Sequence, residues 1–243
     1  MTGNLSPPFF EPISGRPSID PWVFNGAAST EEAEGASSGA TINMPSHSIG
    51  DLLIMWGSAQ PGRPTGWTTL STGNLDCYYK VATSGSEAPV TVVGPPGDEG
   101  RFMHVHSYSH SLGLTPTYVT TFGQQRLGSD DFIIPRLIAT GSYADVLNVS
   151  GAARTGADAQ VTPSFVDLRE RTTAGDTWYQ AIDMDYSEWI PGGTTRFTHM
   201  GSAYGISAIS STPATEWRYW FDPFEGAISG QGTQGTSAMF RGA

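Results

Sequence analysis

The chain of 243 residues is acidic, with a formal net charge of −11 at pH 7, although only 14% of its residues are charged. Nucleic acid is disfavoured as a partner because phosphate binding needs a basic face, and a membrane span is disfavoured because no apolar run approaches the ~18 residues that such a helix needs. With 30 Gly, 17 Pro and 11% aromatic residues, the composition favours a folded protein of short strands and many turns over a disordered chain.

Residues 1–41 are predicted to form an extended N-terminal arm. Prolines alternate with apolar residues as far as the stretch Trp22-Val-Phe24, and each proline removes a backbone donor that a strand ladder would need. Residues 26–40 are low in complexity and are predicted to form a loop. The arm is expected to lie on a surface of its own molecule or of a neighbour. Its first residues lack the basic and apolar regions of a signal peptide, so synthesis in a host cytoplasm is expected.

From residue 41 onwards the apolar pattern has a period of two. Leu52, Ile54 and Trp56 alternate with Leu53 and Met55, which predicts a strand that is buried on both faces. Further strands are predicted at 67–70, 75–82, 90–93, 102–110, 118–122, 131–139, 145–149, 160–168, 177–184, 195–200, 204–210 and 217–221. No segment shows a helical period. The sequence therefore predicts an all-β fold, a β-sandwich of jelly-roll type with extended termini.

An internal duplication is suggested by three pairs of similar segments in the same order. Residues 50–61 resemble 129–142, residues 64–70 resemble 163–168, and residues 75–87 resemble 176–188. This predicts four regions: the arm at 1–41, a first repeat at 42–122, a second repeat at 123–222, and a Gly-rich C-terminal region at 223–243. The last region is predicted to be a second arm or a flexible tail whose apolar tip is Met239-Phe240.

Two catalytic or cofactor motifs match only formally. Ser37 lies in Gly35-Ala-Ser37-Ser-Gly39, but a nucleophile elbow needs a strand before it and a helix after it. The glycines of 230–235 match a dinucleotide fingerprint without the βαβ unit that such a fingerprint requires. Cys77 is the single cysteine, and its place in a strand pattern predicts a buried, inert thiol. We therefore predict no catalytic residue, no cofactor and no enzyme activity.

Metal and glycan sites are also weakly indicated. His104, His106 and His110 share one strand face and could ligate a metal, but without a neighbouring acidic residue or cysteine a hydrogen-bonded sheet surface or a subunit contact is favoured. The remaining candidates are the Ca²⁺-type pairs Asp130-Asp131 and Asp183-Met-Asp185, the glycosidase-type pair Glu170 and Glu188, and the possible sugar-stacking residues Trp178, Tyr179, Trp189, Trp217 and Trp220. Solvated strand edges and core packing are the favoured interpretations, so no metal site is predicted.

One set of segments resembles a known module. The blocks Gly50-Asp-Leu-Leu-Ile, Pro64-Thr-Gly-Trp67-Thr, Tyr78-Tyr-Lys-Val-Ala82 and Gly85-Ser-Glu87 are followed by a Val-Thr-Val strand. This order is similar to a module that is common among tailed-bacteriophage virion proteins. The resemblance covers roughly residues 41–212, and the second copy departs from it at Phe165 and Gln180. It carries no catalytic residue.

The resemblance implies a non-enzymatic structural protein of a phage virion. Capsid decoration is the first expectation. A tail or fibre component is the alternative within that class, and a carbohydrate-binding or hydrolytic β-sandwich is the alternative outside it. The partners implied are the major capsid protein or other virion proteins and further copies of the chain, with a glycan left open and with neither nucleic acid nor membrane. The expected location is the virion.

Overall fold

The computed structural model describes residues 21–32, 40–58, 63–72, 75–92, 101–127, 131–137, 143–157, 168–171, 177–190, 194–209, 215–220 and 232–243. Within these ranges the chain forms strands and turns and contains no helix. The predicted all-β class is therefore confirmed. Residues 1–20, Ser37 and Gly230 lie outside the described residues.

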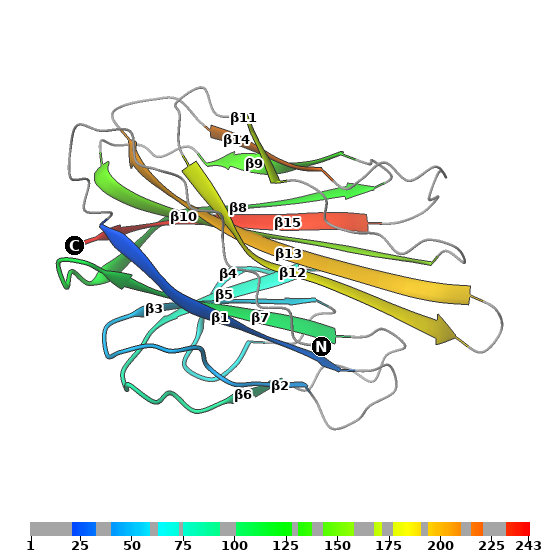
Figure 1. The fold of residues 1–243 in the computed structure, drawn as a ribbon, viewed down its shortest axis with the longest axis horizontal. Helices are drawn as coiled ribbons and strands as arrows, with labels where there is room; N and C mark the ends of the chain where they lie inside the picture. Colours follow the sequence, from blue (N-terminus) through cyan, green and yellow to red (C-terminus); the bar gives the residue numbers. More distant parts are fainter. Residues whose placement is uncertain are drawn as a thin grey trace, which may run out of the picture.

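The strands form four antiparallel sheets. Sheet I has the order β1 (Trp22–Glu32), β7 (Arg101–His110), β3 (Leu52–Ser58), β5 (Leu75–Val81) and β4 (Thr68–Ser71). Sheet II has the order β12 (Thr177–Ile190), β13 (Thr194–Ile209), β10 (Tyr143–Ala157), β15 (Gly232–Gly242) and β8 (Pro116–Leu127). Sheet III contains β11 (Leu168–Arg171), β14 (Thr215–Trp220) and β9 (Asp131–Leu137), and sheet IV contains β2 (Ala40–Ile42) and β6 (Val90–Val92). Figure 1 shows these sheets stacked in the order III, II, I and IV.

Sheet I is covered on both faces, as the pattern of β3 predicted. Leu52, Ile54 and Trp56 pack with residues of β10 and β15 in the core between sheets I and II. Leu53 and Met55 face the other way, into a core shared with Ile42 of sheet IV. All five β3 side chains are fully buried. The alternation of side chains along a strand therefore divides one apolar run between two cores.

The described part of the predicted N-terminal arm is a strand of its own chain. β1 pairs with β7 from Trp22↔His110 to Glu32↔Arg101, with one irregularity between Phe24 and Gly26. Gly26 has a φ of +147° there, a value that glycine adopts easily. The predicted loop at residues 26–40 is wrong for residues 26–32, which belong to β1. The sequence of this segment favours a strand only weakly, but pairing with β7 supplies partners for its backbone hydrogen bonds.

The prediction of a second arm or flexible tail is wrong for residues 232–242. These residues form β15, which pairs with β10 on one side and with β8 on the other. Met239 and Phe240 are buried. Two neighbouring strands supply ladder partners for a Gly-rich segment, and its apolar residues supply the contacts between the sheets, so tertiary context outweighs the low strand propensity of glycine.

The two proposed repeats do not share one pairing scheme. By the sequence similarity, β9 would correspond to β3 and β12 to β5. However, β3 pairs with β5, whereas β9 pairs with β14 and β12 pairs with β13. The segments predicted at 195–200 and 204–210 are one continuous strand, β13, and the predicted boundary at residue 122 falls within β8. The sequence similarity between the two halves thus has no counterpart in these strand pairs.

Candidate functional site

Strand β7 places a row of polar rings between sheets I and II. Its alternate residues Met103 and Val105 belong to the core facing sheet IV, so His104, His106 and Tyr108 face sheet II. His104 and His106 are both 0% exposed. The prediction that the histidines share one face is confirmed. The expected sheet surface or subunit contact is wrong, because this face of β7 is covered by sheet II of the same chain.

His106 is held by a specific set of contacts. Its Nδ1 lies 2.7 Å from the hydroxyl of Tyr108. Its ring centroid lies 4.7 Å from that of Trp56 and 5.7 Å from that of Phe24, both in edge-on geometry. At the end of the row, His110 packs edge-on against Trp22 with centroids 5.1 Å apart. These contacts place the imidazoles in an aromatic layer on the face of sheet I that packs against sheet II.

Burial keeps both inner imidazoles neutral. It lowers the pKa of His104 from 6.5 to about 3, because an imidazolium inside the protein loses its hydration. Burial, followed by the neighbouring His104, also lowers the pKa of His106 well below 6.5. A neutral imidazole can bind a metal or accept a proton. Among the residues that the structure describes, however, no three His, Cys, Asp or Glu side chains are grouped to hold a metal ion.

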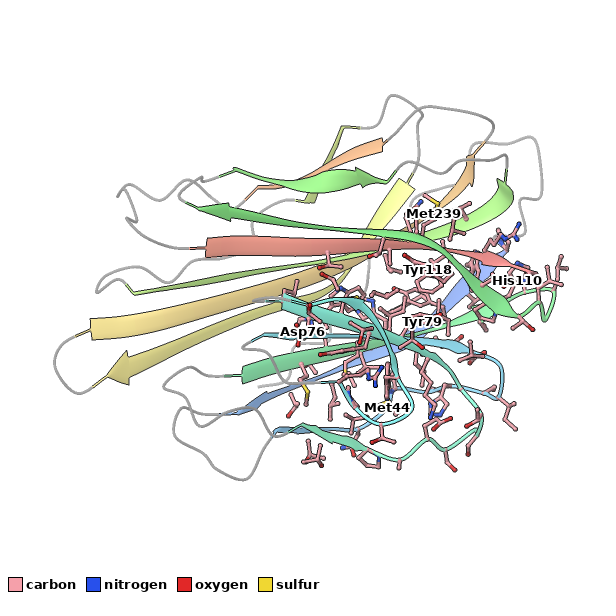
Figure 2. The ribbon with its side chains drawn as sticks, turned by 180° about the vertical axis from the view of Figure 1, so that it is seen from behind. Met44, Asp76, Tyr79, His110, Tyr118 and Met239 are labelled. Carbon is pink, nitrogen blue, oxygen red and sulfur yellow. The ribbon has the colours of Figure 1, made fainter. Side chains whose placement is uncertain are left out.

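A stack of aromatic rings closes the same interface nearer its edge. Tyr79 of β5 and Tyr118 of β8 are nearly parallel, with centroids 6.0 Å apart, and Phe240 of β15 packs edge-on against Tyr79 at 5.3 Å. Figure 2 shows Tyr79 and Tyr118 meeting between the two layers. Tyr118 remains 37% exposed. The stack joins strands of sheets I and II and is used for packing.

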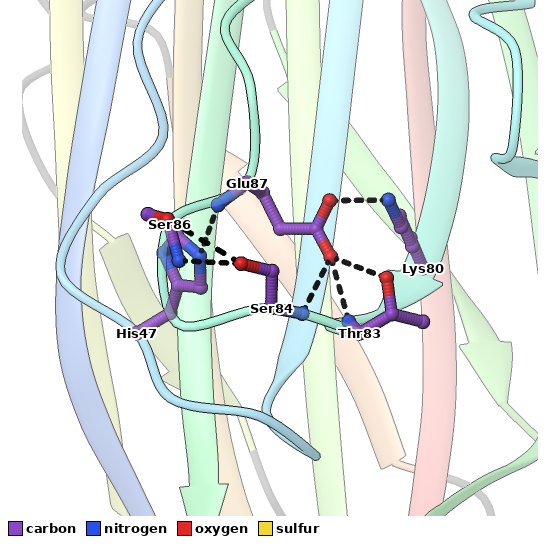
Figure 3. Close-up of polar contacts among 6 residues, drawn as sticks. All are labelled: His47, Lys80, Thr83, Ser84, Ser86 and Glu87. Carbon is purple, nitrogen blue, oxygen red and sulfur yellow. Dashed lines mark hydrogen bonds and ion pairs between the residues drawn. The ribbon is translucent and has the colours of Figure 1, made fainter.

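The second polar cluster is the corner at residues 83–87, between β5 and β6 (Figure 3). Glu87 Oε1 accepts hydrogen bonds from the backbone N–H of Thr83 at 2.6 Å, from the Thr83 hydroxyl at 2.9 Å and from the Ser84 N–H at 3.2 Å. Glu87 Oε2 forms an ion pair with Lys80 Nζ at 2.5 Å. One carboxylate therefore organises the whole turn.

His47 closes this corner from the loop before β3. Its Nδ1 lies 2.6 Å from the Pro45 carbonyl oxygen, and its Nε2 lies 3.0 Å from the backbone nitrogen of Glu87. The backbone N–H must donate to Nε2, so Nδ1 carries the proton and donates to the carbonyl. The nearby hydroxyls of Ser84 and Ser86 lie 3.4 Å from each other. His47 is thus occupied by backbone groups and is not arranged as a base for either serine.

The carboxylate of Glu87 is held in its charged form. The hydrogen bond from Lys80 is the largest cause, and hydrogen bonds from Thr83 add to it, so that the pKa of Glu87 is lowered from 4.5 to about 2. Its side chain is 11% exposed. The charge therefore stabilises the turn, and a carboxyl group that stays ionised at neutral pH is poorly suited to act as a general acid.

Asp51 organises the neighbouring turn in the same manner. Its Oδ2 accepts from the Ser48 N–H at 2.7 Å and from Asn25 Nδ2 at 2.9 Å. Gly50, with a φ of +91°, donates its N–H to the Ala82 carbonyl at 2.9 Å. The Gly-Asp, Val-Ala and Ser-Glu blocks of the module therefore meet at one end of sheet I. The contacts of Asn25 with Asp51 and of His47 with Glu87 could not be predicted from the sequence. The two residues of each pair lie far apart in the chain, and no motif spacing relates them.

The other predicted residues divide into two groups. Cys77 is buried, which confirms that part of its prediction, and burial, followed by the nearby Asp76, raises the pKa of its thiol. The second group lies in strands whose side chains are outside the described residues. Asp131 is in β9, Glu170 in β11, Trp217 and Trp220 in β14, and Trp178, Tyr179, Asp183, Asp185, Glu188 and Trp189 in β12; Asp130 lies outside the described residues altogether. The backbones of Glu170 and Glu188 belong to different sheets.

Comparison with known proteins finds no matching family model, no matching curated protein and no matching solved structure. In the part of the chain that the structure describes, there is no helix that is long and apolar enough to cross a membrane.

Proposed function

We propose that this protein is a non-enzymatic structural component of a bacteriophage virion, and specifically a capsid decoration protein. The observation that carries the proposal is that polar residues of the phage-like module bind to turns and loops of the same chain. Asp51, Lys80 and Glu87 bind turns and neighbouring loops to one end of sheet I. A module whose charged residues stabilise its own loops is suited to a scaffold rather than to catalysis.

The packing supports the same proposal. Sheet I is buried on both faces, and the histidines of β7 and the tyrosines of the ring stack are used between sheets. Close packing of this kind gives a rigid body. The acidic character of the chain favours solubility before assembly and complementarity to a basic surface on a capsid partner. The partners proposed are the major capsid protein, other virion proteins and further copies of this chain.

The test is a peptide inventory of purified virions, with heads and tails separated before digestion. Capsid decoration predicts peptides of this chain in the head fraction, at a copy number comparable with that of the capsid subunits. Recovery in the tail fraction alone would replace decoration with a tail or fibre role. Absence from both fractions would overturn the structural proposal.

A binding experiment separates the structural role from recognition of sugars. Recombinant protein is added to heads that lack it and, in parallel, to an array of glycans. The proposal predicts saturable binding to the heads and no specific binding to the array. Specific glycan binding without head binding would favour a carbohydrate-binding β-sandwich instead.

A further inference from the structure

Exposed apolar side chains lie together at one end of sheets I and II. Among the described residues, the large apolar side chains that remain exposed are Val23 (45%), Ile49 (73%), Leu112 (73%), Leu114 (38%) and Tyr118 (37%). One exposed apolar residue is ordinary, whereas several at one place indicate a contact surface. We infer that these five residues, the apolar end, are the docking surface for residues 1–20 of the same chain. The inference is independent of the proposed function.

The turn between β7 and β8 forms the middle of the apolar end. It carries Leu112 and Leu114, and the Gly113 N–H donates a hydrogen bond of 2.8 Å to the His110 carbonyl oxygen. Gly113 has a φ of +66°, which glycine adopts without strain. Figure 2 shows His110 at this end of the two sheets. A turn that is tied to the end of β7 therefore presents two leucines to the outside.

The other members lie at the same end because their strands begin or end there. Ile49 comes just before β3, whose first residue pairs with Tyr108 of β7. Val23 pairs with Ser109, the last residue but one of β7. Tyr118 is the third residue of β8, which starts soon after the turn. Neighbouring strands lie about 4.8 Å apart and packed sheets about 10 Å apart, so the apolar end is on the order of 20 Å across.

Residues 1–20 join the described chain at this same end. The Pro21 carbonyl oxygen accepts a hydrogen bond of 2.7 Å from the Ser111 N–H, so residue 20 is attached beside the turn that carries the leucines. Phe10 comes eleven residues before Pro21, and a chain of that length spans at most about 36–40 Å. The segment is therefore long enough to reach every part of the apolar end. Its attachment also gives it an effective concentration on the order of millimolar, which a separate partner lacks.

The composition of residues 1–20 matches an apolar surface. The segment contains Leu5, Phe9, Phe10, Ile13 and Ile19, with prolines at 7, 8, 12 and 17. Spaced prolines remove the backbone donors that a strand ladder needs, and twenty residues are too few to bury these side chains in a core of their own. Their burial must come from another surface, and the apolar end is the exposed apolar surface nearest to their point of attachment.

The experiment measures how fast a thiol at the apolar end is alkylated in the full chain. Ser111→Cys places a thiol at an exposed position of the turn, and the native Cys77 does not compete because it is fully buried. The rate is compared with that of the same chain carrying Phe9→Ser and Phe10→Ser. Alkylation should be about fivefold slower with both phenylalanines present, as for a surface that is covered about 80% of the time. Equal rates would overturn the inference.

Ser29→Cys is the matched control for the alkylation rate. Ser29 is exposed on β1, and it lies about 23 Å along that strand from Trp22, so its rate should not respond to the two phenylalanines. A series of protein concentrations then identifies the occupant. Docking within one chain gives protection that does not change with concentration. Protection that grows with concentration would assign the apolar end to a second copy and would overturn docking within the chain.

A second measurement decides the matter if the chain with Ser111→Cys does not fold. A hydrophobic fluorescent dye is added to the wild-type chain and to the chain with Phe9→Ser and Phe10→Ser. The serine variant has fewer apolar residues, yet it should bind more dye, because its apolar end is uncovered. Equal or lower binding of the dye by the serine variant would contradict the inference.

Discussion

The packed interface between sheets I and II, which includes Trp22, Trp56 and Phe240 and is called the joint from here on, differs from the corner at Glu87 in how it uses polar groups. In the joint, burial lowers the pKa of His104 to about 3 and keeps the ring neutral. In the corner, hydrogen bonds from Lys80 and Thr83 lower the pKa of Glu87 to about 2 and keep the carboxylate charged. The same direction of shift thus has two causes, loss of water in one region and gain of partners in the other. Acid is therefore expected to weaken the corner as the pH falls below about 4.5 and Glu87 takes up a proton.

The largest effect is expected from removing residues 1–25. This deletion takes away Trp22 and Phe24, which pack in the joint, together with the start of β1. We predict that the shortened chain no longer folds cooperatively, because each of these aromatic side chains contributes about 1.5–3 kcal/mol when buried and the adjacent strand β7 loses part of its ladder. Circular dichroism during thermal unfolding measures the outcome.

A deletion of residues 1–20 is the matched control, since it keeps all of β1. A folded and cooperative protein after removal of residues 1–25 would show that the joint tolerates the loss of its edge, and that the segment acts only in contacts between molecules.

The next effect concerns the contact of Trp56 with sheet II. A Cβ atom at Gly151 of β10 would lie 2.6 Å from both Cδ1 and Nε1 of the Trp56 indole. Trp56 is fully buried, and a side chain in a close-packed core can shift only at the cost of its other contacts. Gly151→Ala should therefore lower the free energy of unfolding by about 1–3 kcal/mol through overpacking. Gly85→Ala, at a corner position with nothing within 4 Å of the added atom, is the control in a denaturation experiment.

A smaller loss is predicted for Cys77→Ser. The thiol is fully buried in the joint, and a hydroxyl in its place needs a hydrogen bond that the apolar surroundings supply poorly. We expect a loss of about 1–2 kcal/mol in the free energy of unfolding, with the oligomeric state unchanged. An altered oligomeric state at unchanged stability, measured by light scattering, would argue for a functional thiol.

The smallest effect is predicted at the corner. Glu87→Gln removes the ion pair with Lys80 and weakens the bonds to Thr83, and it should cost about 1 kcal/mol at pH 7, since partial exposure screens the interaction. Because the folded pKa lies below the unfolded one, the wild-type advantage is complete above about pH 4.5 and is lost as the pH falls towards about 2.

The measurement for the corner is the difference in unfolding free energy between wild type and Glu87→Gln as a function of pH. The wild-type advantage is expected to be constant above about pH 4.5 and to shrink below it. A difference that persists unchanged at pH 2.5 would mean that the Glu87 charge does not stabilise the corner.

The fold class and the central strand of the joint could be predicted from the residues alone. In residues 52–56 the side chains that point to either face of the strand are apolar, so both faces of the strand must be buried. Cys77 was predicted to be buried for a related reason, since it stands in a strand pattern between apolar neighbours. The Gly-Asp and Ser-Glu blocks are recognisable in the sequence, and they meet at one end of sheet I because β3 pairs with β5.

Only the tertiary structure decided the places of β1 and β15 and the surroundings of the histidines. Neither Trp22–Glu32 nor Gly232–Gly242 has a strong strand pattern, and both become strands because neighbours in the sheet complete their hydrogen bonds. Because side chains alternate along a strand, the sequence could predict that His104 and His106 share one face. It could not predict their burial, which depends on the sheet that covers that face. Local sequence determines where a side chain points relative to its own strand, whereas long-range packing determines whether that direction leads to water or to another sheet.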